Sequence, residues 1–170
     1  KKVFNNKKNM NYLLKLLGIL RISGTAIAFY WGYKIGHTGT YDPIAQLHFM
    51  IPAIIVAISG TSGLEGLFLG NESAKMKGFE VGSNYQRQSA IALLSYAVIA
   101  VLVYLCNWGI RSELTILFTF FFFILFSAIN HGVDAVKNKN YKLQNVNRPF
   151  LTLALIIGLY YPVIMALKTL

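Results

Sequence analysis

Cysteine and charged residues are scarce in this sequence, and each scarcity excludes a class of protein. The single cysteine, Cys106, excludes an internal disulfide framework and a metal site built from several cysteines. Only 13% of the 170 residues are charged, whereas soluble globular domains carry about 25%. The composition therefore argues against a soluble domain.

The sequence also lacks the local signatures of the common enzyme classes. It has no Walker motif, no glycine-rich dinucleotide turn after a strand, and no GxSxG, HExxH or CxxC pattern. Ser127, His131 and Asp134 supply the residue types of a catalytic triad. Side chains on one helix face diverge, however, and rarely form nucleophile–base geometry. We therefore predict no catalytic residue and no cofactor.

Long apolar blocks are what the sequence does contain. Hydrophobic residues make up 55% of the chain, and its mean hydropathy is +0.52. A transmembrane helix needs about 20 mostly apolar residues. The sequence predicts an all-α fold, an integral membrane bundle of five transmembrane helices in one domain, 13–170, after a basic N-terminal tail, 1–12. The five predicted helices are 13–36, 48–70, 89–109, 114–136 and 149–170.

The basic residues predict how the chain is oriented. Twelve of the sixteen lie in the first fifteen residues or in the segments 71–88 and 137–148. Five crossings place these three regions on one side, and short cytoplasmic loops are enriched in Lys and Arg. We therefore predict a cytoplasmic N-terminus and a multi-pass location in the cell membrane. Because this sidedness accounts for the net charge of +10, we expect the lipid bilayer and not nucleic acid as partner.

The start of the chain resembles a signal peptide, with basic residues before an apolar stretch. Lys15 and Arg21 interrupt that stretch. We therefore expect a retained first helix.

Two charged residues, Arg21 and Glu65, lie inside predicted helices at similar depth from the cytoplasmic side. An isolated charge at such a depth costs several kcal/mol, so a partner is expected. The sequence predicts an ion pair between them. Three interpretations stay open: a structural clamp, a proton or ion relay or ligand pocket, and extension of Arg21 to the headgroups.

Other polar residues fall at the same membrane level. His131 and Asp134 are three apart and share a helix face, with Asn130 at its border, and we expect His131 to bond a carboxylate such as Asp134 or Glu65. Small residues at 59–63 and at Gly66 predict close approach of a neighbouring helix. The predicted intramembrane polar cluster comprises Arg21, Glu65, Asn130, His131, Asp134 and Arg87.

Metal binding is only weakly indicated. His37, Asp42 and His48 bracket one outer loop and could supply two imidazoles and a carboxylate. Their spacing is irregular, so we predict no metal site. Ligation of a haem by His131 together with a residue of a partner subunit stays open.

Four stretches together resemble a family of small prokaryotic integral membrane proteins of unknown function. They are SGTSGLEGLFLG, GFEVGSNYQRQSAIALLSYAVIAVLVYLCNWG, SAINHGVDAV and NRPFLTLALIIGLYYPVIMAL. The layout is also distantly similar to that of DoxX-like membrane proteins, which usually have four helices. The first resemblance implies a prokaryotic inner membrane as the location. Neither resemblance implies an activity or a functional residue.

Three functions remain compatible with the sequence. The apolar run FTFFFFILF, 118–126, favours contact with lipid or with a large partner. We therefore predict a non-catalytic accessory or structural subunit of a larger membrane complex, with other membrane subunits as partners. The first alternative is a small transporter, channel or proton-conducting element that uses the polar cluster. The second is a membrane-embedded redox, haem- or metal-binding protein.

Overall fold

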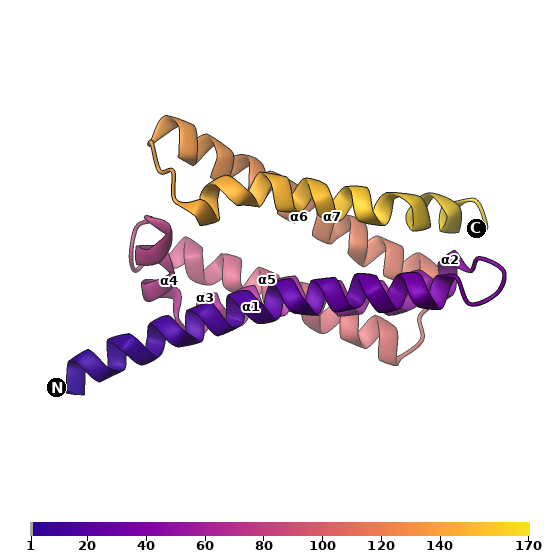
Figure 1. Ribbon diagram of the computed structural model, residues 1–170, viewed down its shortest axis with the longest axis horizontal. Coiled ribbons are helices and arrows are strands. Elements are labelled where there is room, and N and C mark those ends of the chain that lie inside the picture. Colours follow the sequence, from indigo (N-terminus) through magenta and orange to yellow (C-terminus); the bar gives the residue numbers. More distant parts are fainter. Residues whose placement is uncertain (1) are drawn as a thin grey trace.

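The computed structural model describes the backbone of residues 2–170 and the side chains from residue 9 onward. All of its regular elements are helical (Figure 1). They are α1 (Lys2–Gly36), α2 (Pro43–Ile55), α3 (Thr61–Phe68), α4 (Gly70–Lys77), α5 (Asn84–Leu105), α6 (Ile110–Lys137) and α7 (Leu143–Leu167), with a π-helical turn, Val56–Gly60, between α2 and α3.

Five spans in the described residues are long and apolar enough to cross a membrane. They are Asn9–Gly36, Pro43–Phe68, Asn84–Leu105, Ile110–Lys137 and Leu143–Leu167. The prediction of an all-α, multi-pass membrane protein is therefore confirmed at this level.

All five helices start earlier than the sequence predicts, and the starts of α7 and α1 differ most. Helix α7 begins at Leu143, six residues before Pro149, because the amides of Asn145 and Val146 already donate to the carbonyl of Lys142. Helix α1 runs from Lys2 to Gly36, so residues 2–12, which the sequence analysis assigns to the basic tail, are helical. The side chains of residues 1–8, with all four basic groups of that tail, lie outside the described residues.

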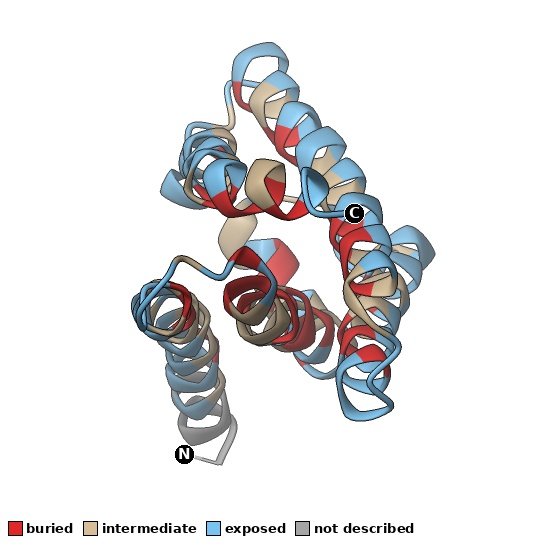
Figure 2. Cartoon of the chain, turned by 90° about the vertical axis from the view of Figure 1, so that its right-hand side faces the viewer, coloured by how far each residue is buried: buried red, intermediate tan, exposed pale blue. Residues whose placement is uncertain are grey.

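Helix α2 forms the centre of the bundle. It packs against α1, α5, α6 and α7, and Leu47, Ile54 and Ile55 are fully buried. The core is completed by side chains such as Phe120 of α6 and Leu159 of α7. Figure 2 shows the buried surface turned toward the middle of the bundle and the exposed surface turned outward.

Large apolar side chains cover the outside of the bundle. In the run 118–126, Phe118, Phe122 and Phe126 are exposed, whereas Phe120 is completely buried in the core. The run is apolar in composition, but helical geometry places its residues on two faces, one turned outward and one turned into the core. Only the outer face is free to meet lipid or a partner.

The second span is irregular along its length. Pro52 lies inside α2, the π-helical turn follows from Val56, and the helix breaks at Leu69, whose φ of −125° and ψ of 22° are not helical. Short π segments within helices occur frequently at functional sites. The break at Leu69 separates α3 from α4.

The two ends of the bundle differ in their basic content. Figure 1 places the N-terminus, α4 and the connection between α6 and α7 at one end, and the C-terminus with the connection between α1 and α2 at the other. The basic segments 71–88 and 137–148 therefore lie at the same end of the molecule. We call this the basic end.

Candidate functional site

A buried carboxylate, Glu65, organises the charged groups at the basic end. Glu65 is 4% exposed. Its Oε2 atom accepts from Arg21 Nη2 at 2.7 Å, and its Oε1 atom accepts from Ser73 Oγ and Lys77 Nζ, both at 2.5 Å. Arg21 is further held by its Nε, which donates to Thr61 Oγ1 at 3.1 Å. The structure thus brings Arg21 and Glu65 together as an ion pair and adds two donors from α4.

The helix break at Leu69 is what brings Ser73 and Lys77 back to Glu65. In a straight α-helix, residues eight and twelve positions further on lie about 12 and 18 Å away along the axis. Because the helix is interrupted at Leu69, α4 does not continue the line of α3, and Ser73 and Lys77 reach the Glu65 carboxylate. Ser73 and Lys77 are four residues apart and therefore share the face of α4 that meets the carboxylate.

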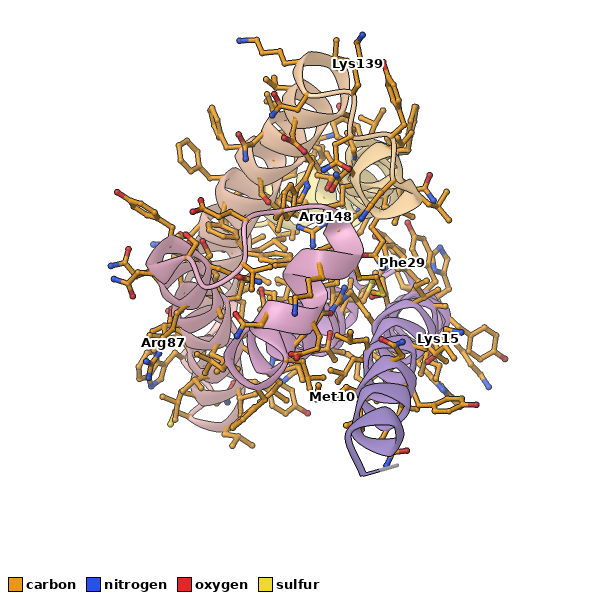
Figure 3. The ribbon with its side chains drawn as sticks, turned by 90° about the vertical axis from the view of Figure 1, so that its left-hand side faces the viewer. Met10, Lys15, Phe29, Arg87, Lys139 and Arg148 are labelled. Carbon is orange, nitrogen blue, oxygen red and sulfur yellow. The ribbon has the colours of Figure 1, made fainter. Side chains whose placement is uncertain are left out.

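Arg148 of α7 adds a third cation to this group. The buried Asn145 fixes the first turns of α7 against α4 by donating from Nδ2 to the Lys77 carbonyl at 3.2 Å. Arg148 is three residues further on, on the same helix face, and lies within electrostatic range of Arg21 and Glu65. Figure 3 shows Arg148 in the middle of the basic end. We call Arg21, Glu65, Ser73, Lys77 and Arg148 the Glu65 cluster.

His131 and Asp134 form a second polar group beside the Glu65 cluster. His131 Nδ1 lies 3.0 Å from Asn145 Oδ1, and Asp134 accepts from Asn138 at 2.7 Å and Asn140 at 2.8 Å. The expectation that His131 bonds a carboxylate is therefore wrong. The amide of Asn145, on the next helix, reaches the imidazole instead. Lys77 joins the two groups, with its carbonyl toward Asn145 and its ammonium toward Glu65.

Two predicted members, Asn130 and Arg87, lie outside both groups. Both side chains are exposed. Asn130 directly precedes His131, and successive residues on a helix differ by about 100° in direction. At the start of α5 it is Gln86, and not Arg87, that faces inward and donates to the Gly70 carbonyl at 2.6 Å.

The charges of the Glu65 cluster do not balance. Arg21 and Lys77 contact the single carboxylate of Glu65, and Arg148 lies within electrostatic range of it, which leaves a formal surplus of two positive charges. Burial lowers the pKa of the Lys77 ammonium, and the nearby Glu65 carboxylate offsets part of that effect. Holding three cations here is therefore unfavourable unless a further anion compensates them.

The opposite end contains a buried pair that the sequence analysis missed. His48 Nδ1 of α2 lies 2.6 Å from Oε1 of Glu113, which is 2% exposed. The metal candidates do not converge there: Asp42 caps α2 by accepting from two backbone amides, and His37 lies between Tyr33 and Tyr41. No group of three or more His, Cys, Asp and Glu side chains fit for a metal occurs among the described residues.

We expect His48→Phe to lower the free energy of unfolding by about 1.5 kcal/mol, because it leaves the buried Glu113 carboxylate without its partner. The phenyl ring keeps the contact with Tyr104, whose ring centroid is 4.6 Å from that of His48. Denaturation in mixed detergent micelles measures the change. The matched control is His37→Phe, in an exposed position, which should change little. Equal effects of the two substitutions would contradict the assignment.

Tyr41, in the connection between α1 and α2, predicts a pH dependence of stability. The pKa of Tyr41 is raised from 10.0 to about 12, mainly by burial and further by the nearby Tyr161, Tyr33 and Asp42. The folded state therefore retains a proton that the unfolded chain loses. This contribution to stability is complete below pH 10 and is lost as the pH rises from 10 to about 12. We expect the free energy of unfolding to fall less over this interval in Tyr41→Phe than in the wild type.

The functional candidates that sequence reasoning missed are Ser73, Lys77, Asn145, Arg148 and Glu113. In the sequence, Lys77 and Arg148 resemble ordinary basic loop residues. Only the helix break at Leu69 and the early start of α7 place them inside the bundle. Glu113 carried a usable signal: it is an acidic residue at the edge of an apolar run, and such residues usually have a partner.

Comparison with known proteins places the chain in a family. Residues 44–169 match DUF6790, a family of unknown function. The match begins within α2 and ends after α7, so it covers Glu65, Lys77 and Arg148 but not Arg21. No curated protein and no solved structure matches the chain, and no similarity to DoxX-like proteins is found. This multi-pass membrane protein therefore belongs to DUF6790, a family of unknown function.

Proposed function

We propose that this protein is a small transport or permeation element, in which the Glu65 cluster receives a polar solute from the basic end of the bundle. The observation that carries the proposal is a buried carboxylate inside a broken membrane span, contacted by charged groups from two other helical segments. Intramembrane ionisable residues of this kind mark solute and ion paths by default.

The irregular second span supports transport over a purely structural role. Transporter sites are typically built from discontinuous helices, whose interruptions expose backbone groups next to a polar cavity. Here the π-helical turn and the break at Leu69 bracket Thr61 and Glu65. A simple ion-pair clamp between two straight helices requires neither interruption.

The basic end is proposed to face the cytoplasm of a prokaryotic cell. The segments 71–88 and 137–148 place basic residues at this end, and cytoplasmic loops are enriched in such residues. A solute would therefore meet the Glu65 cluster from the cytoplasmic side. Cysteine labelling at Lys139 with a membrane-impermeant reagent, in a Cys106→Ser background because Cys106 is itself exposed, tests this orientation, since labelling of intact cells would contradict it.

Flux across proteoliposomes tests the proposed function. We expect a wild-type flux of protons, chloride or inorganic phosphate above that of empty vesicles. We expect Glu65→Gln to lower it at least about tenfold, because Arg21 and Lys77 lose the carboxylate that orients them. Glu80→Gln, at an exposed acidic residue, is the matched control. Because Glu65→Gln can also weaken the fold, Ser73→Ala, which leaves every charge in place, is the second variant. A folded wild-type protein without flux overturns the proposal.

An accessory-subunit role is the second candidate, and the outer face of α6 favours it. Phe118, Phe122 and Phe126 are exposed along this face, and the rings of Phe122 and Phe126 contact each other at a tilt, with centroids 4.7 Å and planes 43° apart. Such a row suits a partner helix. Purification from native membranes in mild detergent should then recover a partner at constant ratio. Substitution of Phe122 and Phe126 by Leu should release it if this face is the contact.

A further inference from the structure

We propose that the Glu65 cluster binds a phosphate-type oxyanion, with Arg148 as its principal ligand. This inference deepens the proposed function by naming the class of solute. It rests on the proposed function only in that the bound anion is also the transported solute. The anion is either a free phosphate compound or the phosphate of an anionic lipid, since both present the same oxygen atoms.

The hydrogen bonds of Glu65 show why Arg148 is available. Arg21 occupies one carboxylate oxygen, and Ser73 with Lys77 occupies the other. Within residues 9–170, Arg148 makes neither an ion pair nor a side-chain hydrogen bond, although its side chain is half-buried. The guanidinium therefore keeps its donors for a ligand, and a planar guanidinium suits bidentate contact with phosphate.

The surplus of positive charge indicates the sign of the ligand. Arg21 and Lys77 both lie within electrostatic range of Arg148, and so does His131. Glu65 is the carboxylate acting directly on Arg148, whereas Asp134 acts on His131 and is already bonded to Asn138 and Asn140. Cations held so close together in a medium of low dielectric constant repel one another strongly. A bound oxyanion removes this repulsion.

The position of Arg148 suits both possible sources of phosphate. It is the sixth residue of α7, so it lies about 8 Å along the helix from the first residue. Lipid phosphates lie just outside the hydrocarbon core, and basic pockets between helices on the cytoplasmic side bind anionic headgroups. A soluble phosphate compound can reach the same level from the basic end.

Thermal unfolding in a neutral, phosphate-free detergent tests the site without requiring transport. We expect inorganic phosphate, or incorporation into nanodiscs containing phosphatidylglycerol in place of phosphatidylcholine alone, to raise the Tm of the wild type. Arg148→Gln should lose this rise and weaken binding at least about tenfold. Without phosphate, Arg148→Gln should melt at or above the wild-type Tm, because the substitution removes repulsion. A purely structural Arg148 predicts a lower Tm instead.

Arg87→Gln is the matched control, since Arg87 is an exposed arginine near the start of α5 at the same end of the molecule. The Arg87→Gln variant should show the same rise in Tm as the wild type. A response to phosphate alone assigns a soluble ligand, and a response to phosphatidylglycerol alone assigns a lipid. The inference is overturned if neither raises the Tm, or if both variants respond alike. A phosphate response without measurable flux would overturn the proposed function and leave the binding site standing.

Discussion

Substituting Glu65 by Gln should lower the free energy of unfolding by about 3 kcal/mol, one of the two largest effects that we expect from a single change. Breaking a buried ion pair typically costs about 3–5 kcal/mol because one charge stays buried without compensation. Here two cations, Arg21 and Lys77, lose their carboxylate, while the partial exposure of the Arg21 side chain, 23%, reduces the penalty. Unfolding by denaturing detergent in mixed micelles provides the measurement.

A double-mutant cycle separates the ion pair from other consequences of the substitution. Arg21→Gln removes one cation, and the combination with Glu65→Gln should cost less than the two single changes together, with a coupling of about 1 kcal/mol or more. Glu80→Gln, at an exposed site, should lie within about 0.5 kcal/mol of the wild type. Strict additivity of the two substitutions would show that the pair does not stabilise the fold.

Substituting Gly63 by Ala should destabilise the protein by about 3 kcal/mol, at the upper end of the usual range for overpacking. A Cβ atom at this position would lie 2.5 Å from Cγ of Leu94 and 2.9 Å from the Ala90 carbonyl oxygen. The leucine can shift, but the carbonyl belongs to the backbone of α5. The substitution must therefore push α3 and α5 apart where the small residues now allow close contact.

Gly18→Ala is the matched control for this prediction. Gly18 is also in a helix, and nothing lies within 4 Å of the Cβ atom that the substitution would add. Alanine favours the helix over glycine by about 1 kcal/mol, so this variant should be neutral or slightly more stable. Unfolding of both variants under the same conditions gives the comparison. Gly63→Ala at or above wild-type stability would rule out the close packing of α3 on α5.

The sequence alone determined the features that depend on composition and on the length of the apolar segments. Apolar blocks of about 20 residues predict membrane-crossing helices, because the thickness of the hydrocarbon core sets that length. The structure confirms five such spans. The pairing of Arg21 with Glu65 also followed from the sequence, since the cost of a lone charge in hydrocarbon is general and their depths matched.

The tertiary structure alone decided which residues surround that pair. The return of Lys77 to Glu65 depends on a helix break at Leu69, and leucine is a residue that favours helices, so its local propensity hides the break. Arg148 enters the same group because α7 starts early and Asn145 fixes it to α4. Such contacts join residues far apart in sequence. Their positions are set by the packing of whole helices and not by local propensity or hydropathy.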